Sequence, residues 1–371
     1  MEKNNIKILI LAGVRPNFIK IAPLLEEIKK HRQIKPVLVH TGQHYDFKMS
    51  QAFFEDLNIP KPNYNLGVGS GSHAYQIGEA LIRLEKVVLK EKPDLIIVVG
   101  DANSCLVGSL VATKLYLPVA HVEAGLRSFN RKMPEEINRL LTDHLSDYLF
   151  VHDPAAVENL LREGVEKKKI FFVGNIMIDS LEQSRKKIKN LKFYKKFGLE
   201  EKEYALLTLH RQENVDDRKI IQEIITAIER IQKRIKIIYP LHVRAEKRIK
   251  EFGFWARIKD MKNLIITSPL SYLKTLSLMA DSRFVMTDSG GVQEETTILS
   301  IPCLTLREET ERPVTVKVGT NKVVGTKEKD IVREALKILN GKIKKGKTPK
   351  YWDGKTAKRI ISIILEKHGK Q

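Results

Sequence analysis

The sequence predicts an α/β protein built from two doubly wound parallel sheets. Short apolar runs alternate with amphipathic stretches of helical spacing, which is typical of parallel strands covered by helices on both faces. The alternation occurs twice, once in each half of the 371 residues, and a chain of this length suits two domains. With 42% hydrophobic and 30% charged residues, the composition supports a globular core.

The first half contains six predicted strands. They are Ile6–Leu11, Pro36–His40, Leu95–Val99, Val119–Val122, Tyr148–Val151 and Ile170–Val173. Helical patterns fall between most of them, including Tyr75–Leu89, Ser104–Lys114 and Pro134–Leu145. We expect the connection to the second half near Gly174–Ser180, just before a highly charged helix.

The second half repeats the pattern and ends in a helix. Its predicted strands are Tyr204–Leu209, Lys236–Tyr239, Leu264–Thr267, Phe284–Thr287 and Cys303–Leu306. The last segment, Trp352–Lys367, has the spacing of an amphipathic helix. In such sheets, ligands bind outside the carboxyl ends of the strands, and the unusual polar residues of this sequence cluster there.

The net charge of +20 lies almost entirely in the second half. Residues 1–180 hold 23 basic and 21 acidic side chains, whereas residues 181–371 hold 42 and 24. Such an excess fits either a nucleic-acid surface or a domain that holds a phosphorylated ligand under a lysine-rich exterior. Helical, solvent-facing lysine patterns such as residues 185–196 favour a solvated face, so we expect no nucleic-acid partner.

Several other classes are excluded by features that the sequence lacks. No stretch approaches the ~18 apolar residues of a membrane helix, and the N-terminal apolar run has no small-residue cleavage site. We therefore expect a cytoplasmic protein without a membrane partner. Two distant cysteines exclude a disulfide scaffold or a zinc ribbon. No metal motif, Walker loop or GxGxxG occurs, so no metal and no cofactor are expected.

Three strand ends of the first half carry ionisable residues. Arg15 and Lys20 lie near a helix N-terminus, which favours anions, although both could simply face water. Asp101 follows the third strand, where an aspartate is often only a helix cap. Glu123, at the end of a buried strand, is costly unless it is paired or functional.

A helix follows that strand end and carries further charge. Glu135 and Arg139 are four residues apart on it, a spacing that suits a salt bridge. A salt bridge accounts for Glu135 alone, but it accounts less well for Asp101, Glu123 and Glu135 meeting at one edge of the sheet. Grouped carboxylates are suited to general acid–base work.

The second half adds two histidines and a glycine turn. His210 and His242 each follow a strand, although a lone histidine is usually structural. The stretch 287–295, TDSGGVQEE, predicts a diphosphate seat, because Ser289, Gly290 and Gly291 let backbone N–H groups approach a ligand at a helix N-terminus. Glu295 follows within two helical turns, where a carboxylate can accept a pair of ribose hydroxyls. A plain Gly-Gly turn is the alternative.

These motifs resemble those of the non-hydrolysing UDP-N-acetylglucosamine 2-epimerases. GVRPNFIK, TGQHYD, GDANS, HVEAGLR, PEEINR, TLHRQEN, DSGGVQEE and ERPVTV occur in the family's order, from Ile6 to about Gly325. The resemblance implies a glycosyltransferase-B-like architecture, with two Rossmann-like domains facing a cleft. It implies a first domain over residues 1–176, a second over 177–350, and a C-terminal helix within 351–371 that returns to the first.

The resemblance also implies a reaction. The family inverts C2 of UDP-N-acetylglucosamine by removing the C2 proton and expelling UDP. An enzyme-bound 2-acetamidoglucal results, and re-addition of UDP gives UDP-N-acetylmannosamine. The chain would therefore be an isomerase of nucleotide sugars for polysaccharide synthesis, with a UDP-sugar substrate, no metal or nicotinamide, and a homodimeric state.

Matching the motifs assigns each candidate residue a role. The catalytic candidates are Asp101, Glu123, Glu135 and His210; the substrate and UDP-binding candidates are Arg15, Lys20, Arg139, Ser289, Gly290, Gly291 and Glu295. A regulatory site for a second substrate molecule, found in bacterial members, would be lined by Gln43, His44, Glu136 and His242.

The sequence departs from the family pattern at three positions. Val14 and Asn17 stand where relatives carry Thr and Glu, which bears on the sugar-side fit. Thr275 stands where relatives often carry an aromatic residue near the uracil. Val14 and Asn17 keep one alternative open, a C2 epimerase of a modified UDP-N-acetylhexosamine such as a diacetamido uronate or a 6-deoxy sugar. A hydrolysing epimerase that releases N-acetylmannosamine and UDP is a further alternative. A glycosyltransferase, which would need an acceptor, is a minor possibility.

Overall fold

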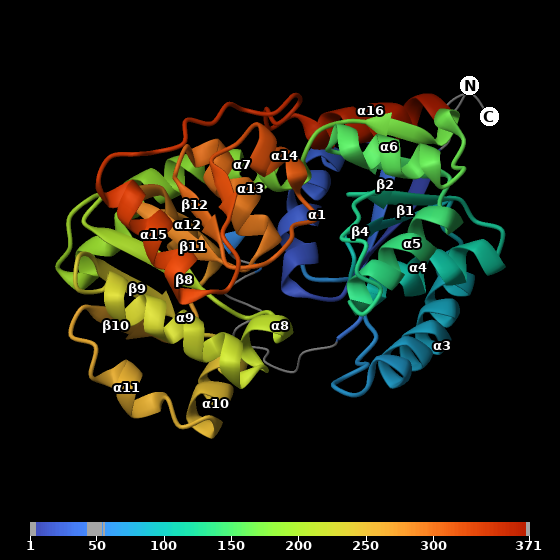
Figure 1. The fold of residues 1–371 in the computed structure, drawn as a ribbon. Coiled ribbons are helices and arrows are strands. Elements are labelled where there is room, and N and C mark those ends of the chain that lie inside the picture. The colour runs from blue at the N-terminus through green and yellow to red at the C-terminus, as the bar shows by residue number, and fades with distance from the viewer. Residues whose placement is uncertain (1–4, 43–53, 55, 369–371) are drawn as a thin grey trace. The chain divides into compact units, whose positions relative to one another are not determined.

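The computed structural model describes residues 5–42, 54 and 56–368. The chain divides into two compact units. Unit 1 runs to Gln183 and resumes at Lys350, and unit 2 covers Ser184–Pro349. Each unit is an α/β unit in its own right (Figure 1).

Unit 1 is built on a parallel sheet with seven strands among the described residues. They are β1 Ile6–Ala12, β2 Ile34–His40, β3 Tyr64–Asn65, β4 Leu95–Val99, β5 Val119–Val122, β6 Tyr148–Val151 and β7 Ile170–Phe172. Their order is β3-β2-β1-β4-β5-β6-β7. This is the doubly wound order, and it reverses direction between β1 and β4.

The helices of unit 1 connect these strands. They are α1 Arg15–Ile28, α3 His73–Glu91, α4 Asn103–Lys114, α5 Pro134–Leu145, α6 Pro154–Arg162, the 3₁₀ turn η1 Lys167–Lys169, α7 Ile176–Leu191 and α16 Thr356–His368. Helix α7 continues through the boundary between the units, so the chain leaves unit 1 inside a helix. Helix α16, in red, packs against α1, in blue (Figure 1).

Unit 2 repeats the architecture with six strands among the described residues, all parallel. They are β8 Tyr204–Thr208, β9 Lys236–Pro240, β10 Leu264–Thr267, β11 Phe284–Thr287, β12 Cys303–Thr305 and β13 Asn321–Val323. The order β10-β9-β8-β11-β12-β13 again reverses direction, here between β8 and β11. The predicted fold class, two doubly wound parallel sheets, is therefore confirmed.

Among the described residues, the helices of unit 2 are shorter on average than those of unit 1. They are the 3₁₀ helix η2 Phe193–Phe197, α8 Gln212–Val215, α9 Arg218–Ile231, α10 Val243–Glu251, α11 Trp255–Lys259, α12 Tyr272–Asp281, α13 Gly290–Leu299, α14 Pro313–Lys317 and α15 Glu328–Leu339.

Local sequence accounts for most of these elements. The strand Leu95–Val99 is an uninterrupted apolar run, and every residue in it is buried, as a central parallel strand requires. Helix α9 has an apolar face buried in the core of unit 2, and Asp217 caps its first turn by accepting hydrogen bonds from the N–H groups of Lys219 and Ile220.

The predicted strands match the observed ones to within two residues at each end. Two short edge strands, β3 and β13, were missed because their residues, Tyr-Asn and Asn-Lys-Val, form no apolar run. The C-terminal helix starts at Thr356, four residues later than predicted. Trp352 lies before the helix, buried, and its indole N–H donates a hydrogen bond to the carbonyl of His152 at 3.0 Å.

Candidate active sites at the carboxyl edges of the two sheets

In unit 1, the loops that carry the predicted acids leave the sheet side by side. Leu11 pairs with Val98 and Val99 pairs with Val122, so β1, β4 and β5 end at the same level. The reversal of strand order lies between β1 and β4, which is where doubly wound sheets bind ligands. A binding or catalytic site is therefore expected at this edge.

Glu123 lies directly after β5 in a conformation that is unusual for its residue type. Its φ is +76°, in the left-handed region, and only 5% of its surface is exposed. The N–H groups of Glu123 and Ala124 both donate to the carbonyl of Phe150, at 3.0 and 3.1 Å, which holds the turn. The carboxylate forms an ion pair with the buried ammonium of Lys20. Strain of this kind is concentrated at functional sites.

Lys20 reaches Glu123 from the second turn of α1. A Cβ atom at Gly100, whose φ is +84°, would lie 3.0 Å from the Lys20 Nζ, so a glycine is required there. Arg15, at the start of the same helix, is exposed. Asn17 is almost fully buried, accepts hydrogen bonds from the N–H groups of Gly13 and Val14, and donates to the carbonyl of Val99 at 2.7 Å. Asn17 thus braces the loop between β1 and α1 from within.

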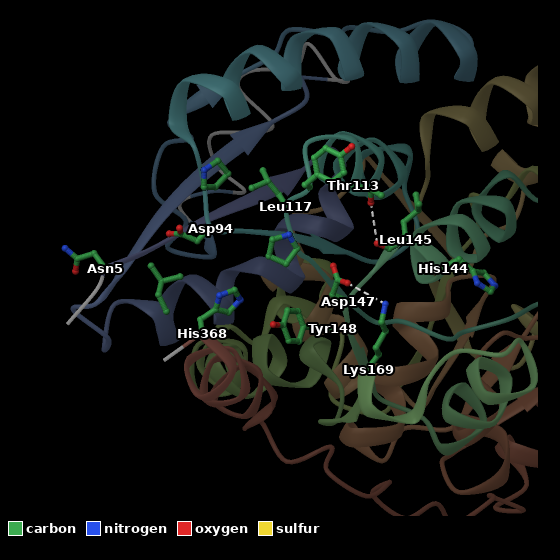
Figure 2. Close-up of a pocket in the computed structure, with 14 residues that line it drawn as sticks. Asn5, Asp94, Thr113, Leu117, His144, Leu145, Asp147, Tyr148, Lys169 and His368 are labelled. Carbon is green, nitrogen blue, oxygen red and sulfur yellow. Dashed lines mark hydrogen bonds and ion pairs between the residues drawn. The ribbon is translucent and has the colours of Figure 1, made fainter. Parts of the chain in front are cut away.

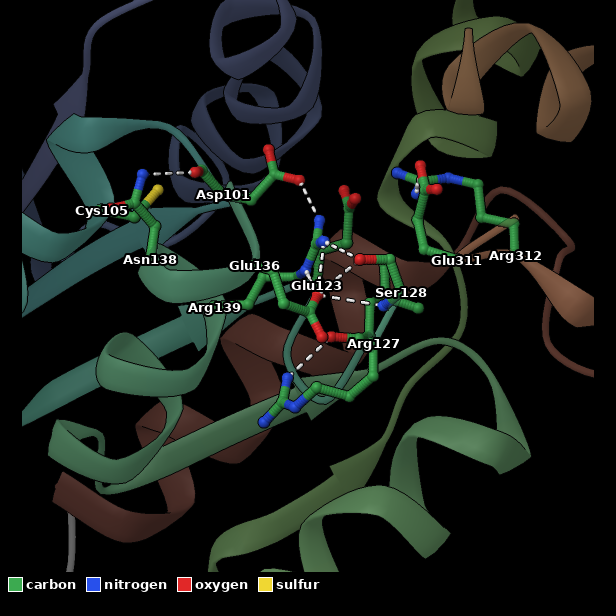
Figure 3. A network of polar contacts seen from close by, with 12 residues as sticks. Asp101, Cys105, Glu123, Arg127, Ser128, Glu136, Asn138, Arg139, Glu311 and Arg312 are labelled. Atoms are coloured by element: carbon green, nitrogen blue, oxygen red, sulfur yellow. Dashed lines mark hydrogen bonds and ion pairs between the residues drawn. The ribbon is translucent and has the colours of Figure 1, made fainter. Parts of the chain in front are cut away.

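Asp101 belongs to a chain of charges that Figure 3 shows. The buried Arg139 donates from Nη1 to Asp101 Oδ2 at 2.6 Å and from Nη2 to Glu136 Oε2 at 2.6 Å. Glu136 also accepts from the N–H groups of Ser128 and Phe129 at 3.0 and 2.9 Å. Burial works to raise the pKa of Glu136, but the Ser128 N–H and Arg139 outweigh it, and the pKa is lowered.

Two of the structural alternatives for this region are wrong. Asp101 does not cap α4, because the N-cap is Ala102 and the Asp101 side chain turns to Arg139. Arg139 pairs with Glu136 and not with Glu135. Glu135 is half-exposed on the first turn of α5, and no residue that the structure describes hydrogen-bonds or ion-pairs with its carboxylate.

Asn138, which sequence reasoning missed, holds the Asp101 loop from α5. Its side-chain amide donates to the carbonyl of Asp101 at 3.0 Å and to the Asn103 side chain at 3.1 Å. Asn103 in turn contacts Nδ1 of His73, on the first turn of α3, at 3.1 Å. Asn138 could have been found by its spacing, since it is three residues from Glu135 in the motif PEEINR.

In unit 2, His210 is oriented by a buried carboxylate that the sequence analysis did not single out. Asp288 is fully buried, and its Oδ1 lies 2.9 Å from the Nδ1 of His210. The N–H groups of His210 and Arg211 also donate to Asp288, each at 2.9 Å. Burial works to raise the pKa of Asp288, but His210 and these N–H groups lower it overall. With Nδ1 donating to Asp288, the half-exposed ring presents Nε2 outward.

The predicted glycine turn lies at the start of α13, directly after β11. Gly290 is the first helical residue, and a Cβ there would lie 2.8 Å from the guanidinium carbon of Arg312 and from Glu311. The first turn of a helix leaves backbone N–H groups without helical partners. Ser289 precedes this position and its N–H donates to Thr287 Oγ1 at 2.9 Å, so Gly290 and Gly291 carry the N–H groups that could face an anion here.

A buried cluster of ion pairs packs against that turn. Arg312 contacts Glu294 at 2.8 Å and Glu311 at 2.9 Å, and Arg307 contacts Glu311 at 2.8 Å. All four side chains are at most 6% exposed. Burial would raise the pKa of Glu311, but Arg312 and Arg307 hold it well below its usual range. The cluster thus accounts for the two charged residues of the motif ERPVTV, Glu311 and Arg312, which lie close to the glycine turn.

Glu295 lies one helical turn further along α13, buried next to the Tyr272 hydroxyl. Burial raises the pKa of Glu295 to about 8, and the neighbouring Glu294 adds to the rise, although Tyr272 opposes it. Thr275 is one of the three departures from the family pattern. Its hydroxyl donates a hydrogen bond to the carbonyl of Ser271 at 3.0 Å.

The predicted regulatory residues are divided between the units. Gln43 and His44 lie outside the described residues, and Glu136 is buried with Arg139. His242 caps α10, with Nδ1 accepting from the N–H of Arg244 at 3.2 Å, and its ring lies 6.0 Å from that of His210. A regulatory role for these residues stays a prediction.

A cavity of about 930 Å³ lies at the opposite edge of the first sheet (Figure 2). It is lined by residues at the amino ends of the strands, including Asp94, Asp147, Tyr148 and Lys169, and by residues at helix ends, including His368 of α16. None of the predicted site residues contributes to it. Within the described part of the chain, no group of three or more His, Cys, Asp or Glu side chains could hold a metal ion, and no helix is both long and apolar enough to cross a membrane.

Two doubly wound units, each with ionisable side chains at the strand reversal, define a two-domain α/β enzyme of the glycosyltransferase-B-like class. A family model described as UDP-N-acetylglucosamine 2-epimerase matches residues 26–365. The chain belongs to the UDP-N-acetylglucosamine 2-epimerase family, which confirms the resemblance and the prediction of an isomerase.

Individual relatives agree with this assignment. The UDP-N-acetylglucosamine 2-epimerase of Methanocaldococcus jannaschii is 47% identical over 363 residues, covering 96% of this chain and 98% of the relative. Its crystal structure with UDP-GlcNAc and UDP has a TM-score of 0.90, with 46% identity over 97% of this chain and 100% of that one. A UDP-2,3-diacetamido-2,3-dideoxy-D-glucuronate 2-epimerase of Pseudomonas aeruginosa is 40% identical, over 97% of this chain and 99% of the relative.

Proposed function

We propose that this protein interconverts UDP-N-acetylglucosamine and UDP-N-acetylmannosamine by the non-hydrolysing route. The proposal rests above all on one observation: Asp101 and Glu123 leave one sheet edge at the same level, and each is paired with a buried cation. The substrate follows from the epimerase relatives, one of which was crystallised with UDP-GlcNAc and UDP.

The chemistry requires an elimination followed by an addition. A base takes the C2 proton while the bond from C1 to the UDP oxygen breaks, which yields 2-acetamidoglucal and UDP. Re-addition of UDP at C1 with protonation of C2 on the opposite face inverts that carbon. Because the proton leaves from one face and returns to the other, acid–base groups are needed on both faces. Asp101, Glu123 and Glu135 are the candidates in unit 1.

Unit 2 is proposed to hold UDP. In the turn Ser289–Gly291, the N–H groups of Gly290 and Gly291 would stabilise charge that develops on the diphosphate as the bond to C1 breaks, since the N–H of Ser289 donates to Thr287 Oγ1. His210, with Nδ1 fixed by Asp288, would donate from Nε2, and Glu295 would accept the ribose hydroxyls. Arg15 and Lys20 would contact the phosphates from unit 1; in this structure Lys20 is paired with Glu123.

One reaction in D₂O tests the proposal. Protein and UDP-GlcNAc are mixed without metal or nicotinamide, and proton NMR follows the C2 and anomeric signals. We expect UDP-ManNAc with deuterium at C2 and the same mixture from either starting sugar. Asp101→Asn and Glu123→Gln should each lose a factor of about 100 or more in kcat. Glu158→Gln, which replaces an exposed carboxylate on α6, should leave kcat unchanged.

The outcomes separate the alternatives. Free N-acetylmannosamine and UDP would indicate the hydrolysing branch. Folded protein that leaves UDP-GlcNAc unchanged would contradict the proposal. UDP-2,3-diacetamido-2,3-dideoxy-D-glucuronate would then be tried, because the Pseudomonas aeruginosa relative acts on that sugar by name.

A homodimer is proposed as the working state. Three exposed apolar residues, Tyr75, Ile82 and Leu89, recur every seven positions and so form one stripe along α3. They are 50, 57 and 55% exposed, which is unusual for an unpartnered helix face. Light scattering should give twice the 42.5 kDa chain mass, and Ile82→Glu should reduce it to one chain. A single-chain mass for the unaltered protein would contradict the proposal.

We propose that the basic excess of the second half is a solvated surface, and that the reaction takes place in the cytoplasm, without nucleic acid or membrane. Lys247 and Arg230, for example, lie exposed and paired with acidic neighbours. Salt-sensitive retention of DNA or RNA by the purified protein would contradict this reading.

A further inference from the structure

His121 is a fully buried histidine on β5, two residues before Glu123. Its Nδ1 lies 2.7 Å from Oδ1 of Asp143, and its Nε2 lies 2.8 Å from the carbonyl oxygen of Gly100. A carbonyl oxygen and a carboxylate can only accept. Each ring nitrogen therefore carries a hydrogen, which makes the ring an imidazolium cation.

Asp143 is the counter-ion, and both of its carboxylate oxygens have partners. It is 1% exposed; its Oδ2 accepts from the N–H of Gly125 at 3.0 Å and contacts Nη1 of Arg127 at 2.7 Å. Arg127 in turn makes a bidentate contact with Glu163, at 2.8 and 2.6 Å. Burial works to raise the pKa of Asp143, but His121 and Arg127 outweigh it and lower it.

The pair contacts both loops that carry the proposed acids. His121 holds the carbonyl of Gly100, the residue before Asp101. Asp143 holds the N–H of Gly125, two residues after Glu123. Gly125 packs closely against α6 and must be a glycine, because its φ is +79° and a Cβ there would lie 2.6 Å from the carbonyl oxygen of Ala156. One ion pair, from β5 and α5, thus spans the two strand ends.

We propose that the His121–Asp143 ion pair is a positioning device that sets the distance between Asp101 and Glu123 by clamping their two loops. The inference rests on the proposed function, since it assigns the pair to the same acid–base site. Neither residue is proposed to touch the substrate, because both are buried beneath the loops.

A purely structural pair would affect folding stability alone. A positioning pair affects the step in which the C2 proton moves, while UDP binding is retained. Misplacing a reacting group by about 1 Å costs about 100-fold in rate. Asp143→Asn removes the counter-charge at nearly constant volume, and His121→Gln can keep a contact to only one of its two partners.

The first measurement uses the unaltered protein and needs no substrate. NMR of protein labelled with ¹⁵N histidine should show one ring with slowly exchanging hydrogens on both nitrogens near neutral pH. In Asp143→Asn that ring should lose one of them. A single ring hydrogen on His121 in the unaltered protein would overturn the ion-pair assignment, whether or not the protein is an epimerase.

The second measurement compares kinetics with UDP-GlcNAc. We expect His121→Gln and Asp143→Asn to lower kcat and deuterium incorporation at C2 by about 100-fold, with KM for UDP-GlcNAc changed less than about threefold. The matched control is His152→Gln, another buried histidine of unit 1, whose ring packs 5.9 Å from Trp352.

The outcomes are decisive in each case. Folded variants with unchanged kcat would overturn the proposal, as would a loss of the same size in the control. If His121→Gln fails to fold, Asp143→Asn and the NMR measurement decide. If the unaltered protein lacks epimerase activity, the proposed function fails, while the NMR result still shows whether the ion pair exists.

Discussion

Glu295 combines burial with an incompletely paired carboxylate. Its Oε1 accepts no hydrogen bond from any residue that the structure describes, and its pKa lies at about 8 because burial disfavours the charge. A buried, incompletely paired carboxylate is costly in the empty protein. Two ribose hydroxyls would supply the missing donors. The burial that makes the carboxylate unfavourable in the empty protein is therefore also what suits Glu295 to its proposed role.

A pH dependence of UDP binding follows from Glu295. Ribose hydroxyls donate hydrogen bonds and therefore favour the ionised carboxylate of Glu295. UDP binding thus lowers the pKa of Glu295 from about 8, and below that pH binding is accompanied by release of a proton. Affinity for UDP should rise with pH, by up to about tenfold per unit, and level off above pH 8. Calorimetry across this range measures it, and Glu295→Gln, which cannot ionise, corrects for the titration of UDP itself. Identical profiles for both proteins would contradict the role of Glu295.

At the scale of elements, helix α13 depends on a glycine at its first position. The close approach of Arg312 to Gly290 brings the buried ion cluster against the turn that is proposed to bind diphosphate. The arginine cannot move aside without losing Glu294 and Glu311, so space at Gly290 is limited by buried charges as well as by sterics.

Gly290→Ala should therefore both destabilise the protein and weaken UDP binding. The clash is expected to cost about 1–3 kcal/mol of unfolding free energy and at least about tenfold in UDP affinity, because the N–H groups of the turn are displaced. Urea unfolding and UDP calorimetry check the two effects, and wild-type affinity in Gly290→Ala would rule out the anion seat at this turn.

At the scale of the whole molecule, unit 1 is assembled from two distant parts of the chain. The carboxylate of Asp179, on α7, accepts hydrogen bonds from the N–H groups of Thr356 and Ala357, 177 and 178 positions away, and so caps α16. A Cβ at Gly174 would lie 2.0 Å from the carbonyl oxygen of Tyr351, so only glycine permits this crossing of the two segments.

The cap makes stability depend on pH in a definite direction. Burial, aided by Asp353 and opposed by the two N–H groups, raises the pKa of Asp179 from 3.8 to about 6. Its folded form thus binds a proton that the unfolded form has released. The unfolding free energy should fall as pH rises from 3.8 to about 6, by up to about 3 kcal/mol from this residue. Urea unfolding of the unaltered protein and of Asp179→Asn isolates the contribution of Asp179 as the difference between their unfolding free energies. A difference that stays constant over this pH range would refute the assignment.

The sequence by itself determined the two series of strands, the family and the residues at the strand ends, because periodicity and contiguous motifs are local properties. Only the tertiary structure decided which charges pair. Arg139 pairs with Glu136 because the N–H groups of Ser128 and Phe129 hold that carboxylate in the interior, whereas Glu135 is half-exposed. Asp143 and Asp288 reach their histidines from 22 and 78 positions away. Burial makes such pairs obligatory, and no sequence spacing encodes a contact between separate elements.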